Sequence, residues 1–251
     1  MLRSRRCERV GGFFYWFIIF AVNDDLIDQI ISGSDERQTR ASLENHLREV
    51  ERNLAQLPAF SANQRQMLVL EKAAVLVELE DKPQAWKLAR ASFDYFLETE
   101  QWQSAVEACE LVYRCDCEDS IPALGMACWL AITYPIDPIL SIRVIHYVID
   151  ETPDDSDGGA VAAVVAHYVA DLRVSGEQRD SLLFLTKQKI ADVARRHRNI
   201  TDEESINIWM EILGLKDAKE FLPAMAKVID VITGDKWWFD REQLRARLPF
   251  N

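Results

Sequence analysis

The feature that most constrains the fold is a series of apolar stripes with helical spacing between residues 61 and 173. Within each stripe, apolar side chains recur three and four positions apart, which is the period of one face of an α-helix. The stripes follow one another at intervals of about twenty residues, as in helix-hairpin arrays. Glycine and proline are scarce, at 9 and 8 residues among 251, which disfavours turn-rich β-structure. The sequence therefore predicts an all-α fold, an α-solenoid array of antiparallel helix hairpins.

Interruptions in this pattern divide the chain into four regions. Residues 1–22 form a basic and apolar N-terminal extension, and residues 23–60 contain amphipathic helices that precede the array. Residues 61–175 form the predicted helical-hairpin repeat core. Residues 176–251 form a C-terminal helical region, which begins after the Ser175-Gly176 break.

Local residue types predict several helix ends. The first residue of a helix donates no hydrogen bond within the helix, so a proline, which lacks the amide proton, is favourable there. A helix is therefore expected to begin at Pro83. Thr201 and Glu204 have the spacing of a capping box, in which Thr201 would cap the next helix. Gly214 and Gly234 follow apolar periodic segments and are expected to end them.

The N-terminal extension allows three interpretations. Arginines precede an apolar run that ends at Val22, as in a secretory signal, but no small-residue cleavage pattern follows. The run is shorter than the roughly 20 apolar residues that cross a bilayer. It is therefore a poor signal, a membrane-surface anchor, or the product of a start codon assigned too early, and we favour the last. We expect membrane contact, if there is any, only through residues 10–22.

The charge and the cysteine content indicate the class of partner and the compartment. The net charge of −12 repels phosphate backbones, so we expect no nucleic acid partner. The basic run from Arg195 to Arg198 is interpreted as a complement to the negative end of a helix dipole. Five cysteines, an odd number, indicate reduced thiols and a cytoplasmic protein.

The segment from Phe93 to Tyr113 resembles the middle of a tetratricopeptide repeat, and the partial match extends over residues 83–117. Phe96 and Trp102 stand at the family's aromatic positions, and Ala105 stands at the small position where two helices pack closely. The match departs from the family at Phe93 and Cys117. Because most proteins of that family are interaction scaffolds, the resemblance implies a protein-binding module without chemistry of its own.

Two histidine–carboxylate pairs are the candidates for a metal site. His146 and Asp150, and likewise His167 and Asp171, are four residues apart on adjacent predicted helices, so each pair shares a helix face. We expect these histidines to border the core, and metal ligation is the alternative. A four-cysteine site is disfavoured, because two of its members fall on apolar helix faces: Cys109, Cys115, Cys117 and Cys128.

The sequence has no phosphate-binding glycine loop, nucleophile elbow or zinc-protease motif, so we expect no catalytic residue and no cofactor. Trp237, Trp238 and Phe239 form an aromatic cluster that either packs on the body or anchors a partner. The function expected is that of a non-enzymatic adaptor or assembly factor that binds a protein or peptide. The alternative is a metal-dependent enzyme or metal sensor that uses His146 and His167.

Overall fold

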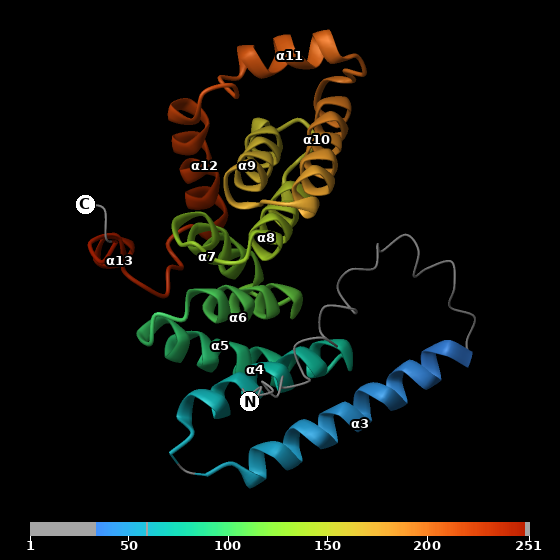
Figure 1. Cartoon of the computed structure of the whole chain (residues 1–251), viewed down its shortest axis with the longest axis vertical. Coiled ribbons are helices and arrows are strands. Elements are labelled where there is room, and N and C mark those ends of the chain that lie inside the picture. Colours follow the sequence, from blue (N-terminus) through green and yellow to red (C-terminus); the bar gives the residue numbers. More distant parts are fainter. Residues whose placement is uncertain (1–33, 59, 249–251) are drawn as a thin grey trace, which may run out of the picture. The chain divides into compact units, whose positions relative to one another are not determined.

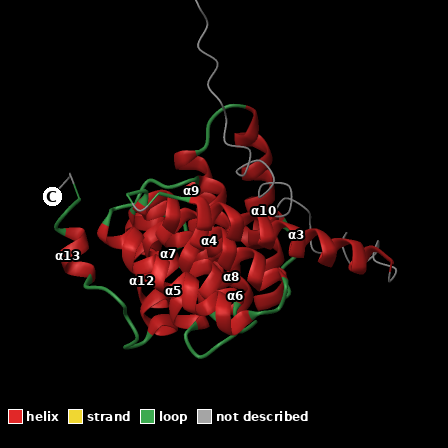
Figure 2. Cartoon of the chain, turned by 90° about the horizontal axis from the view of Figure 1, so that it is seen from below, coloured by secondary structure: helices red, strands yellow, loops and turns green. Residues whose placement is uncertain are grey.

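The computed structural model describes residues 34–58 and 60–248, and this part of the chain contains eleven α-helices and no strand (Figure 2). The predicted all-α fold is therefore confirmed. The chain divides into two compact units, residues 1–46 and residues 47–251. The predicted extension at residues 1–22, with its apolar run, lies outside the described residues.

The helices follow one another with short connections (Figure 1). They are α3 (Ser34–Gln56), α4 (Ala62–Glu78), α5 (Lys82–Glu98), α6 (Trp102–Arg114), α7 (Ser120–Thr133), α8 (Pro138–Glu151), α9 (Asp157–Arg173), α10 (Glu177–Arg198), α11 (Glu203–Ile212), α12 (Ala218–Thr233) and α13 (Arg241–Arg245). The described part of the first unit is the N-terminal portion of α3.

Within residues 47–251, each helix from α4 to α10 packs against the next one along the chain (Figure 1). The chain then turns back, and α12 packs against α7 and α9. One continuous hydrophobic core extends from Leu70 in α4 to Leu244 in α13. The C-terminal helices therefore share the core of the hairpin array.

Helix α7 lies at the centre of this core, and nearly all its side chains are buried. Its Gly125 permits a very close approach of α12, because a Cβ atom there would lie 2.0 Å from the Thr233 Oγ1 atom. The Thr233 hydroxyl is buried and has no hydrogen-bond partner within the described structure. The contact between α7 and α12 thus depends on the absence of a side chain at residue 125.

Most helix ends follow the expected chemistry. Helix α5 begins at Lys82, one residue before the predicted start at Pro83, because Asp81 is the N-cap and accepts a hydrogen bond from the Gln84 amide. Gly214 and Gly234 have φ angles of +66° and +57° and follow α11 and α12, as predicted.

The predicted cap of α11 was wrong by one residue. Asp202, not Thr201, is the N-cap, and its carboxylate accepts a hydrogen bond from the Ser205 amide. An aspartate caps at least as well as a threonine and also carries the negative charge that the helix N-terminus favours.

Candidate functional site: a polar seam between α6 and α8

Helices α6 and α8 meet through a pair of oppositely charged side chains, although each packs mainly against other helices. Arg143 of α8 donates two hydrogen bonds to the Glu110 carboxylate of α6, from Nε at 2.7 Å and from a terminal nitrogen at 2.8 Å. The Glu110 side chain is only 2% exposed. A carboxylate buried this deeply requires a charged partner, and the two-point geometry of Arg143 supplies one.

A second carboxylate lies one helical turn before Glu110. Burial raises the pKa of Glu107 to about 7, and the neighbouring Glu110 adds to this effect. The Gln103 side-chain amide donates to Glu107 at 3.2 Å, which opposes the increase. Glu107 is therefore a carboxyl group that titrates near neutral pH and that a nearby cation would ionise.

Two tyrosines continue the seam toward the end of α8. The rings of Tyr113 and Tyr147 lie 5.1 Å apart between centroids. The Tyr113 hydroxyl donates to the Glu151 carboxylate at 2.7 Å. Burial, together with this hydrogen bond, raises the pKa of Tyr113. We define the seam face by the residues Glu107, Glu110, Tyr113, Arg143, Tyr147 and Glu151.

Sequence reasoning did not find the seam face. Glu107 and Glu110 are three residues apart and interrupt the apolar pattern of α6. This interruption was the feature of the sequence that could have indicated a polar site. Their partner Arg143 is 33 residues after Glu110, so spacing within one helix could not reveal the pair.

The pH dependence of stability should report on Glu107. Its pKa is about 7 in the folded chain against 4.5 without the fold, so the folded state retains a proton that the unfolded state releases. The resulting stabilisation is complete below pH 4.5 and is lost as the pH rises through 7. Replacing Glu107 by Gln removes the titrating group. Between pH 4.5 and pH 8, the free energy of unfolding of this variant should therefore fall less than that of wild type, by roughly 1–3 kcal/mol.

Urea unfolding of wild type and Glu107→Gln between pH 4.5 and pH 8 measures this difference. Glu203→Gln is the matched control, because its side chain is 79% exposed. Parallel pH profiles for wild type and Glu107→Gln would contradict the assignment.

The first predicted metal pair, His146 and Asp150, lies on α8 beside α10. Asp150 accepts a hydrogen bond from the Lys189 ammonium at 3.0 Å. The His146 Nε2 atom is buried without a hydrogen-bond partner in the described structure. Burial, with Lys189 as a further cause, lowers the pKa of His146 to about 4. The imidazole is therefore neutral at physiological pH, and its carboxylate neighbour is engaged by a cation.

Side chains of α10 also contact both members of the second predicted pair, His167 and Asp171. His167 Nδ1 lies 2.9 Å from the Thr186 hydroxyl oxygen, and Asp171 forms an ion pair with Arg179. Because the Thr186 hydroxyl donates to the Leu182 carbonyl, it accepts from His167. Among the described residues, no group of three or more histidine, cysteine, aspartate or glutamate side chains is arranged to hold a metal ion.

The aromatic cluster of the C-terminal segment packs against the body. Trp238 meets the Phe93 ring edge to face at 5.2 Å between centroids, and Phe239 lies 5.5 Å from Trp129. Trp237 is also edge to face with Trp129, at 6.3 Å. All three predicted partner-binding aromatics are half-buried rather than fully exposed.

Two arginines lie over the rings of Trp238 and Trp237. The Arg90 guanidinium lies 4.2 Å from the centre of the Trp238 ring, and Arg241 lies 4.1 Å from that of Trp237. Such cation–π contacts attract a cation to the negative face of the ring.

The basic end of α10 lies against the acidic loop that precedes α9. Arg196 pairs with Asp154 at 3.1 Å, and the buried His197 contacts Asp157 through Nε2 at 3.1 Å. The Trp209 indole donates to His197 Nδ1 at 3.3 Å, so the histidine proton is on Nε2. The predicted dipole complement is thus accompanied by an ion pair of Arg196 and a polar contact of His197 that the sequence did not reveal.

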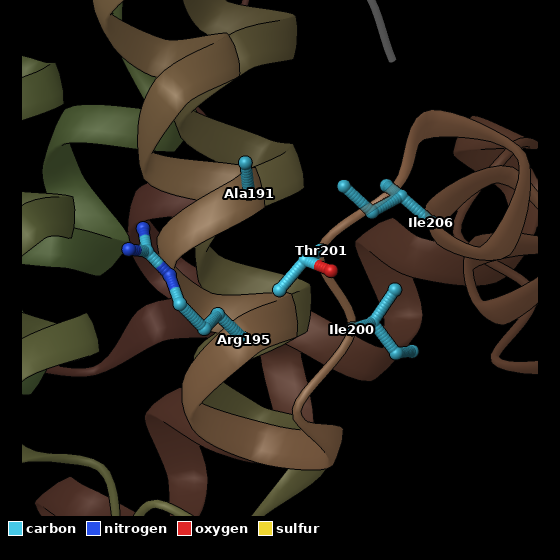
Figure 3. A pocket seen from close by; sticks show the side chains of 5 residues that line it. All are labelled: Ala191, Arg195, Ile200, Thr201 and Ile206. Atoms are coloured by element: carbon cyan, nitrogen blue, oxygen red, sulfur yellow. The ribbon is translucent and has the colours of Figure 1, made fainter.

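A small hollow lies where α10 meets α11, with a volume of about 170 Å³ (Figure 3). Its lining comes from α10, the connecting loop and α11: Ala191, Arg195, Ile200, Thr201 and Ile206. Small-molecule sites are commonly about 300–1,000 Å³, so this hollow is small for a ligand pocket.

The described cysteines are free thiols. Cys109, Cys115 and Cys128 are buried, and Cys117 is exposed. Burial raises the pKa of Cys115 to about 11, and it raises the pKa values of Cys109 and Cys128 further. These three thiols are therefore protonated at neutral pH and behave as small apolar side chains.

Comparisons with protein-family models, with curated proteins and with solved structures find no match. None of the described helices has the length and apolar character needed to cross a bilayer.

Proposed function

We propose that this chain is a non-enzymatic adaptor or assembly factor, and that its seam face binds a basic segment of a partner protein. The proposal is based on one observation: the C-terminal segments pack on some helices of the array more than on others. Helix α12 packs on α7 and α9, and the C-terminal aromatics pack on α5 and α7. On α6 and α8 the seam face is partly open to solvent: Glu151 is exposed, Glu110 is buried, and the other four residues are half-buried.

The residue types of the seam face support a protein-binding role. Tyrosine and arginine are enriched in protein interfaces, and the face holds Tyr113, Tyr147 and Arg143 close together. Tyrosine contributes a large apolar area and a polar hydroxyl at a small cost in conformational entropy. The partial tetratricopeptide-like pattern at residues 83–117 points to the same class of function.

Charge supports a basic partner. Glu107 and Glu151 lie on this face beside the Glu110–Arg143 ion pair, and the whole chain carries a net charge of −12. A lysine or arginine of the partner near Glu107 would lower the pKa of that carboxyl from about 7 and gain an ion pair. Binding of this kind should weaken as salt screens the charges.

The proposal is tested by purifying the tagged chain from its native cells, identifying the partner and measuring its direct binding. We expect a stoichiometric partner with a basic contact segment, whose affinity falls at least about tenfold with Tyr147→Ala or Glu151→Lys. Glu203→Lys on α11 makes the same charge change at a side chain that is 79% exposed, and it should bind as wild type.

Equal losses in Glu151→Lys and Glu203→Lys would show that only the net charge matters. Unchanged affinity in both seam variants would overturn the assignment of the face.

The alternative, a metal-dependent enzyme or metal sensor, has weaker support. The orphan Nε2 atom of His146 favours it, but Asp150 and Asp171 pair with Lys189 and Arg179. Stoichiometric metal in the purified protein, lost with His146→Ala, would revive this alternative.

A further inference from the structure

The C-terminal segment contacts the array in the way that a bound peptide contacts a receptor. We define the arm as residues 236–248 and the seat as Arg90, Phe93, Met126, Trp129 and Tyr134. At the centre, Trp238 and Phe239 contact the rings of the seat. The Trp238 amide lies 3.4 Å from the Met126 sulfur atom. Farther along, the Tyr134 hydroxyl donates to the Leu244 carbonyl at 3.2 Å.

Ion pairs surround this aromatic centre. Lys236 pairs with Glu118 at 2.7 Å, and Arg247 lies 3.7 Å from Glu100. Arg241 pairs with Asp230 of α12 at 2.5 Å. A central group of aromatic anchors with a charged rim is the usual organisation of a protein–peptide interface. In each of these pairs the arm supplies the cation and the body supplies the carboxylate.

The connection of the arm to the body permits release. Gly234, with a φ angle of +57°, ends α12, and Asp235 and Lys236 after it are exposed. The arm contains only the five-residue helix α13; Leu244 is the one buried side chain among residues 236–248, and the three aromatics are half-buried. The rim pairs are exposed on at least one side, and such pairs contribute little to stability. Opening the arm should therefore require less free energy than unfolding the array.

We propose that the seat is a second peptide-recognition site, separate from the seam face, and that the arm occupies it as an intramolecular competitor. The ligand class is a short basic segment with adjacent aromatic residues, as in Lys236-Trp237-Trp238-Phe239. Tethering gives the arm a high effective concentration, so an external segment binds only when it outcompetes the arm or when the arm is released.

The test uses the full chain and a synthetic peptide with the sequence of residues 235–248. Trp237→Ala/Trp238→Ala should release the arm, and this variant should bind the peptide at least about tenfold more tightly than wild type does. Adding Trp129→Ala should abolish binding, and a peptide with both tryptophans replaced by alanine should not bind. Glu151→Lys should leave peptide binding unchanged, so failure here is distinct from failure of the seam-face proposal.

The proposal would be overturned if the peptide did not bind the folded Trp237→Ala/Trp238→Ala variant. It would also be overturned if adding Trp129→Ala to that variant left the affinity for the peptide unchanged. If the double variant does not fold, hydrogen exchange of the wild-type chain decides. We expect the arm amides of residues 237–244 to exchange through openings of lower free energy than those of α7. Equal protection of the arm and α7 would show that the arm is a fixed part of the core.

Discussion

Replacement of Arg143 by Met is expected to lower the free energy of unfolding by about 3–5 kcal/mol, the largest single effect that we predict. The change leaves the Glu110 carboxylate, 2% exposed, without the guanidinium that donates to both its oxygens. An unpaired buried charge loses its hydration without any compensating attraction. Urea or thermal unfolding measures the loss.

The double variant Glu110→Met/Arg143→Met is the matched control. Two apolar side chains can replace a buried ion pair at little cost, so most of the lost stability should return. A double variant as unstable as Arg143→Met would mean that packing, rather than the unpaired charge, causes the loss. A single variant within about 1 kcal/mol of wild type would show that water reaches Glu110.

Replacement of Gly125 by Leu should cost at least about 3 kcal/mol by forcing α7 and α12 apart. Even a Cβ atom at residue 125 would lie 2.0 Å from Thr233 Oγ1 and 3.0 Å from an Ile232 side-chain carbon. Both neighbours are β-branched side chains with few alternative rotamers, so they cannot move aside easily. Thermal unfolding and the near-ultraviolet circular dichroism of the tryptophans follow this loss.

A smaller series isolates the contact. Gly125→Ala should be destabilising, and Thr233→Ala should restore much of the loss because it removes the oxygen nearest to the new Cβ atom. Thr233→Ala alone should be close to neutral, since its buried hydroxyl has no partner in the described structure. Additive effects of the two alanine substitutions would argue against direct contact at this crossing.

The two binding proposals concern different surfaces and can fail independently. The seam face is tested with Tyr147 and Glu151, whereas the seat is tested with Trp129 and the arm. If both are correct, the chain can hold a basic segment at the seam face while its own arm controls access to the seat.

The sequence by itself determined the helical class and many local ends. The spacing of apolar residues, the scarcity of glycine, and proline and glycine at particular positions act within one or two helical turns. Gly214 and Gly234 therefore follow their helices as predicted, and the start of α5 lies one residue before the predicted Pro83. The cap of α11 was missed because Thr201 and Asp202 are adjacent capping residues, and the local pattern does not decide between them.

Only the tertiary structure decided which distant side chains meet. Arg143 lies 33 residues from Glu110, and Trp238 lies more than a hundred residues from the Met126 sulfur that its amide approaches. The return of α12 onto α7 and α9 creates the covering of one side of the array. Helical periodicity indicates which face of a helix is apolar, but not which helix covers it, because many neighbours can bury the same stripe equally well.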